Sequence, residues 1–236
     1  MIPVIVYLTI YHSNTIQSDR YYLLAIRAEK YQNWKAVTYF ANKAYTLNPK
    51  RKKILSSSAR GYIESGEFQK GLAALKTVIK AYPFNMNANL NLGSAYFGLQ
   101  KYDRAMESFQ RTLEIKPDFS KAHAGIGKIH MIQKEYFKAV CSFQKGLKNI
   151  PDNAVILNNL GFSQFQIKSY KDAAQTLKKT VALQPGMVSA QMNLAVLYYK
   201  HLNQQEKGIK YFKNVLTLKP DLKASKKIKK LINNFP

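Results

Sequence analysis

The feature that most constrains the fold of this chain is a regular spacing of proline residues. Six of its eight prolines lie 34 or 35 residues apart: Pro49, Pro83, Pro117, Pro151, Pro185 and Pro220. Proline fixes φ and disfavours the helical conformation in the residue before it, so a proline that returns at one interval marks the same boundary in each copy. The spacing predicts a tandem array of about six structural repeats.

Between successive prolines the same pattern of small and large residues returns. In the copy at residues 86–119 the pattern consists of Leu92, Gly93, Tyr96, Ala105, Phe109, Leu113 and Pro117. The first three share one helical face and the next three share another, with a short polar stretch between them. Small residues therefore face large ones where two helices approach closely. We expect two antiparallel helices in each unit, the second ended by the proline.

This pattern resembles the tetratricopeptide repeat, a 34-residue helix-turn-helix unit, and the resemblance covers Ser18 to the end of the chain. It implies an all-α fold, a right-handed superhelical α-solenoid of antiparallel helix pairs. The expected units within residues 18–220 are about 18–51, 52–85, 86–119, 120–153, 154–187 and 188–222. The last unit has one extra residue between His201 and Gln205, which we expect to lengthen the turn between its helices.

After Pro220, residues 221–236 combine an apolar stripe with lysines on the opposite side of a helix. The stripe includes Leu222, Ile228 and Leu231. A repeat array needs a polar cap at each end, so this segment is predicted to be a basic C-terminal capping helix. The alternative is a cationic amphipathic helix that lies on an anionic membrane.

The N-terminal residues 1–17 form a separate apolar segment and linker. Residues 2–10 are uncharged and the first charged side chain is Asp19. The run is shorter than the ~20 residues that cross a bilayer, and it lacks the basic start and cleavage site of a signal peptide. We interpret it as the tail end of a transmembrane helix. The alternative is an extra cap that folds over the exposed face of the first repeat.

The junction between this segment and the first repeat also resembles a second family. In bacterial O-antigen ligase-like and polymerase-like membrane proteins, a final membrane span leads into a soluble tetratricopeptide tail. The residues that carry the likeness are Tyr21, Tyr22, Ala25, Ala28, Trp34 and Ala36. The glycan-handling part of such an enzyme has no counterpart in these residues, so no catalytic residue is carried over.

Residues suited to catalysis or metal binding are sparse. The chain has one cysteine, Cys141, and four histidines, and it contains no Gly-rich phosphate loop, GxSxG elbow or HExxH motif. His123 and His130 share a face of one helix, but the sequence offers them no carboxylate or cysteine partner. We therefore predict a protein that is not an enzyme, with no cofactor, no metal site and no catalytic residues.

The resemblance places the partner-binding surface on the first helix of each unit, which lines a concave groove. Asparagines precede the Leu-Gly position of several units, and cations or large apolar side chains follow it. The candidate residues are Arg60, Asn91, Phe97, Lys128, Met131, Asn159, Phe165, Asn193 and Tyr199. Their amides could bind an extended peptide backbone, as a recurring asparagine ladder does in the peptide-binding part of O-GlcNAc transferases. The alternative is that these residues only pack within the repeat.

Charge is the outlier of the composition. The chain has 37 Lys plus Arg against 13 Asp plus Glu, a net charge of +24, so its surface attracts polyanions. Codon bias toward lysine is an equally simple source of this excess. Most of the basic residues are lysines spread along the chain rather than arginines in a recognised module, so we expect no specific nucleic-acid binding.

These observations favour an interaction scaffold that binds an extended peptide or helix of a partner protein in its concave groove. The alternative is a soluble tetratricopeptide appendage of a membrane protein that assembles envelope glycan, with an anionic membrane or glycan surface as a second partner. The N-terminal segment favours the bacterial cell envelope or its membrane over the cytoplasm. The pattern specifies no oligomeric state.

Overall fold

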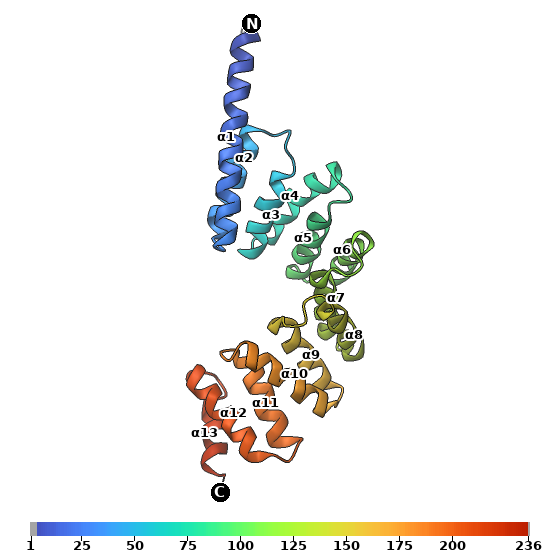
Figure 1. Cartoon of the computed structure of the whole chain (residues 1–236), viewed down its shortest axis with the longest axis vertical. Helices are drawn as coiled ribbons and strands as arrows, with labels where there is room; N and C mark the ends of the chain where they lie inside the picture. The colour runs from blue at the N-terminus through green and yellow to red at the C-terminus, as the bar shows by residue number, and fades with distance from the viewer. Residues whose placement is uncertain (1–3, 236) are drawn as a thin grey trace. The chain divides into compact units, whose positions relative to one another are not determined.

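The computed structural model describes the backbone of residues 4–235 and the side chains from Tyr11 to Phe235. This part of the chain is all-α, with thirteen helices and no strand (Figure 1). The helices are α1 (Val4–Lys30), α2 (Trp34–Leu47), α3 (Ile54–Glu64), α4 (Phe68–Ala81), α5 (Met86–Gly98), α6 (Tyr102–Ile115), α7 (Ser120–Ile132), α8 (Tyr136–Leu147), α9 (Ala154–Gln166), α10 (Tyr170–Leu183), α11 (Val188–Lys200), α12 (Gln205–Leu218) and α13 (Ser225–Asn233).

The chain divides into two compact units, Met1–Pro117 and Asp118–Pro236. Unit 1 contains the helix pairs α1–α2, α3–α4 and α5–α6. Unit 2 contains the pairs α7–α8, α9–α10 and α11–α12, followed by α13. Within each unit every helix packs against the next helix in the chain. The expected all-α solenoid of helix pairs is confirmed.

The turn between the two helices of a pair is built in the same way in five repeats. At each turn one residue has a positive φ, and these residues are spaced 34 apart: Gln32, Gly66, Gln100, Lys134 and Lys168. After α7 the Lys134 N–H donates to the Met131 carbonyl at 3.1 Å and the Glu135 N–H donates to the His130 carbonyl at 2.8 Å. These two hydrogen bonds form a Schellman motif, which reverses the chain direction within three residues.

The extra residue of the last repeat lies in its turn, as expected. Four residues, 201–204, separate α11 from α12, whereas three residues separate α9 from α10. The residue with positive φ in this turn is Asn203, at 51°. The insertion therefore lengthens the connection and leaves α11 and α12 as long as their counterparts.

The prolines end the second helices by the predicted mechanism. Before Pro117, for example, Lys116 has φ −139° and ψ 94°, an extended conformation outside α6. Five of the second helices end two residues before their proline. The exception is α8, which ends at Leu147, four residues before Pro151.

Close approach of small and large residues forms the core of each pair, as the sequence pattern predicts. A Cβ at Gly93 would lie 2.5 Å from the ring of Phe109, and one at Gly127 would lie 2.7 Å from the ring of Phe143. Both rings are buried. The glycines therefore let the two helices of a pair approach to the distance that buries these rings.

The two ends of the chain are helical. At the C-terminal end α13 packs on α12 with Ile228 buried and its lysines exposed. At the N-terminal end the sequence predicts a linker before Ser18, but α1 runs without interruption from Val4 to Lys30. The reason is local: residues 4–17 contain no proline or glycine, and the Ser18 hydroxyl anchors this helix by donating to the Ala44 carbonyl at 2.8 Å.

Membrane insertion was predicted for residues 2–10, whose side chains lie outside the described part of the structure. Among the described residues, none of the helices combines the length and the hydropathy that crossing a bilayer requires.

Candidate partner-binding surface

All nine candidate residues lie on the first helices of the helix pairs. Unit 1 has Arg60 on α3 and Asn91 and Phe97 on α5. Unit 2 carries the other six in pairs: Lys128 and Met131 on α7, Asn159 and Phe165 on α9, Asn193 and Tyr199 on α11. None is buried, and Lys128 is the most open. Because α9 contacts both α7 and α11, the three first helices of unit 2 are neighbours.

The asparagines of this surface have unused hydrogen-bonding groups. Within the described residues, the side-chain amides of Asn91, Asn159 and Asn193 form no hydrogen bond, and all three are partly exposed. By contrast, the buried amides of Asn89 and Gln191 donate to the carbonyl oxygens of a preceding proline at 3.0 and 2.9 Å. The structure thus distinguishes the structural amides of Asn89 and Gln191 from the free amides of the three candidate asparagines.

The aromatic candidates are half-buried and oriented by neighbouring rings. The Phe97 and Tyr102 ring centroids are 5.8 Å apart. Phe165 lies 5.9 Å from Tyr170 and 5.3 Å from His201, and Tyr170 stacks on His201 at 4.5 Å. Such contacts restrict ring orientation while leaving part of each face open.

The aromatic cluster of Phe165, Tyr170 and His201 is not predicted by the sequence pattern described above. A signal was present, because a large apolar residue precedes the tyrosine of the second helix by five residues in three repeats, at residues 97, 131 and 165. A five-residue separation that spans a tight turn brings the end of one helix onto the start of the next.

Met131 and Tyr199 also contribute to the core. Met131 packs against a buried cluster that includes Phe143 and Leu160, and Tyr199 lies 6.0 Å from the ring of Phe212. For these two residues, packing within the repeat accounts for part of the side chain. The rest of each side chain is partly exposed.

The two cationic candidates differ in their electrostatic surroundings. Arg60 pairs with Glu29 of α1, lies 4.0 Å from a carboxylate oxygen of Glu64 and sits over the ring of Trp34 at 5.3 Å. Its charge is thus balanced within unit 1. Lys128 is exposed and has no ion pair among the described residues, so its ammonium group is available to an acidic partner.

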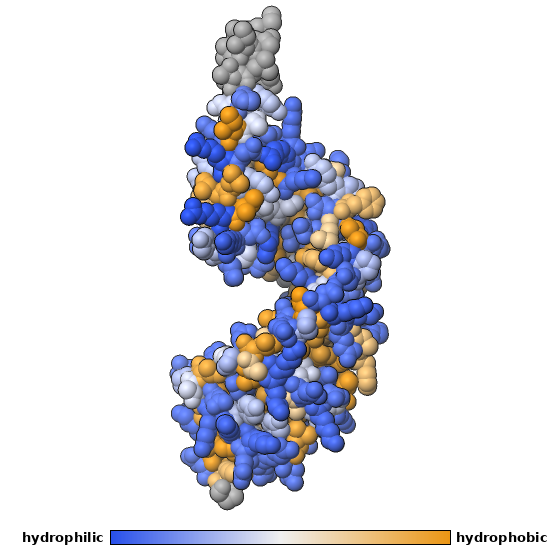
Figure 2. Space-filling model, viewed as in Figure 1, coloured by the Kyte–Doolittle hydropathy of each residue, from blue (hydrophilic) through white to orange (hydrophobic). Residues whose placement is uncertain are grey.

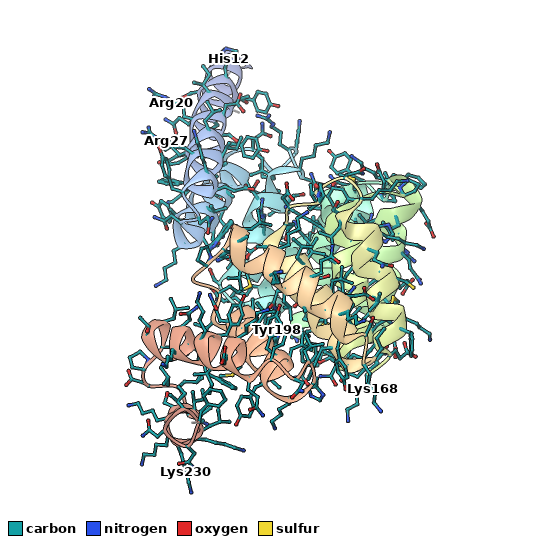
Figure 3. The ribbon with its side chains drawn as sticks, turned by 60° about the horizontal axis from the view of Figure 1, so that its bottom comes forward. His12, Arg20, Arg27, Lys168, Tyr198 and Lys230 are labelled. Carbon is teal, nitrogen blue, oxygen red and sulfur yellow. The ribbon has the colours of Figure 1, made fainter. Side chains whose placement is uncertain are left out.

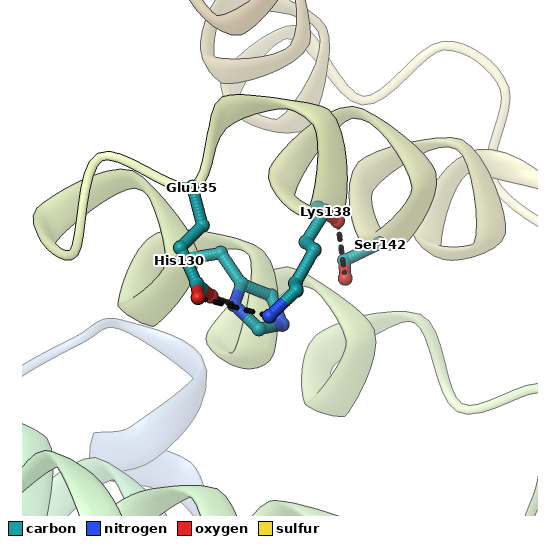
Figure 4. A network of polar contacts seen from close by, with 4 residues as sticks. All are labelled: His130, Glu135, Lys138 and Ser142. Atoms are coloured by element: carbon teal, nitrogen blue, oxygen red, sulfur yellow. Dashed lines mark hydrogen bonds and ion pairs between the residues drawn. The ribbon is translucent and has the colours of Figure 1, made fainter.

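The surroundings of His130 correct one expectation from the sequence. His130 does have a carboxylate partner, because its Nδ1 lies 2.7 Å from Glu135 Oε2, while Lys138 donates to the other oxygen at 2.9 Å (Figure 4). The bond from Lys138 and then the bond to His130 lower the pKa of Glu135. The contacts join the end of α7 to the start of α8. No group of three metal-ligating side chains occurs among the described residues.

Comparison with known proteins identifies the repeat. Family models described as tetratricopeptide repeat match residues 57–120 and 188–222. The chain is therefore a tetratricopeptide repeat protein. No curated protein sequence matches it. The resemblance to the tail of O-antigen ligase-like proteins is not among these findings and stays a prediction.

Solved structures share the fold at low sequence identity. PilF of Pseudomonas aeruginosa is similar with a TM-score of 0.79 and 14% identity, over 93% of this chain and 99% of that chain. YrrB, described as a TPR protein with an unusual peptide-binding site, has a TM-score of 0.64 and 16% identity, over 80% of this chain and 97% of that one. MamA has a TM-score of 0.61 and 23% identity, over 72% and 96%.

Proposed function

We propose that this chain is a non-enzymatic scaffold that binds an extended peptide segment of a partner protein across the first helices of its repeats. The observation that carries the proposal is the pair of free, partly exposed amides of Asn159 and Asn193 on the neighbouring helices α9 and α11. An extended peptide presents N–H and C=O groups at regular intervals, and an asparagine amide can donate to one and accept from the other.

The neighbouring side chains suit the rest of such a ligand. The half-exposed rings of Phe165 and Tyr199 offer apolar contact on the same helices, each six residues after the asparagine. Lys128 and the net charge of +24 favour peptides with acidic side chains and raise their rate of association. We therefore expect the preferred peptides to be extended, acidic and interrupted by apolar residues.

The test is binding of the full chain to an array of synthetic peptides that vary in net charge and apolar content, followed by calorimetry on the strongest binders. The double variant Asn159→Ala/Asn193→Ala removes the two amides. Each lost hydrogen bond to the peptide costs about 1 kcal/mol, so we expect roughly tenfold or greater weakening.

The matched control is Gln144→Ala/Gln175→Ala, which removes two exposed amides from the second helices α8 and α10. We expect this control to bind like the unmodified chain. Equal binding by all three proteins, or equal weakening in both variants, would overturn the proposal. Circular dichroism of each protein establishes that the helices are intact.

A further inference from the structure

The outer faces of the two terminal helices differ in character. On α13 the exposed side chains are mainly lysines, which give this end of the array a polar cover. On α1 the exposed side chains include large apolar residues: Ile16 is 51% exposed, Leu23 64% and Ile26 46%. Figure 2 shows hydrophobic residues interspersed with hydrophilic ones over the part of unit 1 that adjoins the grey N-terminal residues.

Among the described side chains of unit 1, none covers this apolar face of α1. The opposite side of the helix carries the buried residues Ser18 and Ala25, and α1 packs there on α2 and α3. Residues 16, 23 and 26 lie on the other side by helical spacing, and their exposure agrees with that placement. The face therefore remains open after the unit has folded.

Cations accompany the apolar residues on the same face. Arg20, Arg27 and Lys30 are exposed, and in Figure 3 the two labelled arginines project away from the rest of the unit, on one side of α1. The two carboxylates of α1 are neutralised by arginines from outside the helix, Asp19 by Arg51 and Glu29 by Arg60. The outer face of α1 therefore combines apolar side chains with a positive charge.

The segment between α2 and α3 adds three more exposed lysines, Lys50, Lys52 and Lys53, next to Arg51, which pairs with Asp19 of α1. Lys50 lies over the Tyr11 ring at 5.4 Å, and Arg51 lies over the Tyr22 ring at 5.9 Å. These contacts hold the basic segment against α1. A second group of positive charge thus borders the apolar face.

We infer that the outer face of α1 and residues 50–53 form a docking surface for an anionic phospholipid bilayer. The apolar side chains enter the boundary between headgroups and acyl chains, and the arginines and lysines bind the lipid phosphates. The N-terminal part of α1 supports a bilayer as the binding partner. The helical backbone of α1 extends to Val4, and residues 4–10 contain no charged residue. A second copy of the chain is disfavoured, since two such faces would bring like charges together.

This surface is separate from the proposed peptide-binding surface. It contains none of the nine candidate residues, and the Glu29 that pairs with Arg60 is partly buried and does not belong to the outer face. Bilayer docking and peptide binding can therefore succeed or fail independently in experiments.

The test is co-sedimentation of the full chain with two kinds of vesicle, phosphatidylcholine alone and phosphatidylcholine mixed with phosphatidylglycerol. We expect strong binding to the anionic vesicles only, and weaker binding at high salt. The variant Arg20→Gln/Arg27→Gln should lose about tenfold or more in vesicle affinity, since each basic residue near an anionic surface contributes about fivefold. Leu23→Ser should also weaken vesicle binding, because the variant lacks the apolar side chain that inserts into the bilayer at this position.

The matched controls are Lys210→Gln/Lys213→Gln and Ile132→Ser, which make the same kinds of change at exposed positions of unit 2. Both should bind vesicles like the unmodified chain. Equal binding to neutral and anionic vesicles would overturn the inference. So would equal losses in the α1 variants and their controls, or α1 variants that bind unchanged. All substituted side chains are exposed, and thermal melts check that each variant folds.

Discussion

At the scale of single residues, glycine sets the distance between the helices of a pair. At Gly127 an added methyl group would meet the ring of Phe143, which is fully buried and cannot move away without disturbing its neighbours. At Gly186, outside the helices, an added methyl group would meet nothing within 4 Å. Alanine substitution at Gly127 therefore tests the packing of the helix pair. The same substitution at Gly186 tests only the effect of replacing glycine on the unfolded chain.

We predict that Gly127→Ala destabilises the chain. Overpacking costs about 1–3 kcal/mol, and the gain in helix propensity returns about 1 kcal/mol, so a net loss near 1 kcal/mol is expected. Gly186→Ala should cause no loss, because it only restricts the unfolded chain. Urea unfolding followed by circular dichroism measures both. A Gly127→Ala protein as stable as the Gly186→Ala protein would contradict this account of the packing.

A second prediction at this scale concerns Glu135, whose pKa is lowered by Lys138 first and His130 second. A lowered pKa in the folded state means that the carboxylate stabilises the fold above its ordinary pKa. That contribution is lost as the pH falls through the lowered value. Glu135→Gln should therefore reduce the melting temperature at pH 7, and the difference from the unmodified chain should shrink well below pH 4.5.

The control for this experiment is Glu114→Gln, which removes an exposed carboxylate that has no ion pair among the described residues. Thermal melts at neutral and acidic pH measure both variants. If the two variants changed the melting temperature equally at both pH values, the contacts of Glu135 with His130 and Lys138 would make no specific contribution.

At the scale of elements, the turns are the most regular part of the molecule. The residue with positive φ recurs every 34 positions in five repeats, yet only Gly66 suits this conformation without steric cost. Glutamine or lysine occupies the other four positions. The Schellman hydrogen bonds therefore hold ordinary residues in a left-handed conformation, and those turns store a small amount of strain.

We predict that Lys134→Gly stabilises the chain by about 0.5–1 kcal/mol, because glycine adopts the positive φ of 60° without a Cβ penalty. Replacing a lysine by glycine within a helix should instead lower the stability of the chain. Lys178→Gly, at an exposed position of α10, is expected to cost about 1 kcal/mol. Urea unfolding of both variants tests the pair. A Lys134→Gly protein less stable than the unmodified chain would show that the turn does not strain lysine.

At the scale of the whole molecule, positive charge is plentiful and largely unpaired. The chain has 37 basic residues but 13 acidic ones, so most cations have no acidic partner. Several of the acids lie in ion pairs that join neighbouring helices or turns, such as Asp19 with Arg51 and Glu29 with Arg60. This arrangement concentrates unbalanced positive charge on outer surfaces, where it can act on acidic peptides or anionic lipids.

Much of the fold followed from the sequence, and part of the candidate surface did too. Proline spacing and the Gly-to-Phe pattern report on contacts between residues close in the chain, so the helix pairs could be predicted. The candidate asparagines could be placed on first helices for the same reason. Their free amides could not be foreseen, because Asn89 and Asn91 look alike in sequence while only Asn89 is buried and bonded.

The amino-acid sequence by itself determined the repeat, the antiparallel helix pairs, the prolines that end them and the excess of positive charge. These depend on backbone preferences and periodicity, which are local. Only the tertiary structure decided that Glu29 neutralises Arg60, that Glu135 binds His130 and that α1 leaves an apolar and cationic face open. Those features depend on which side chains meet across helices and turns, and a one-dimensional pattern carries little information about such contacts.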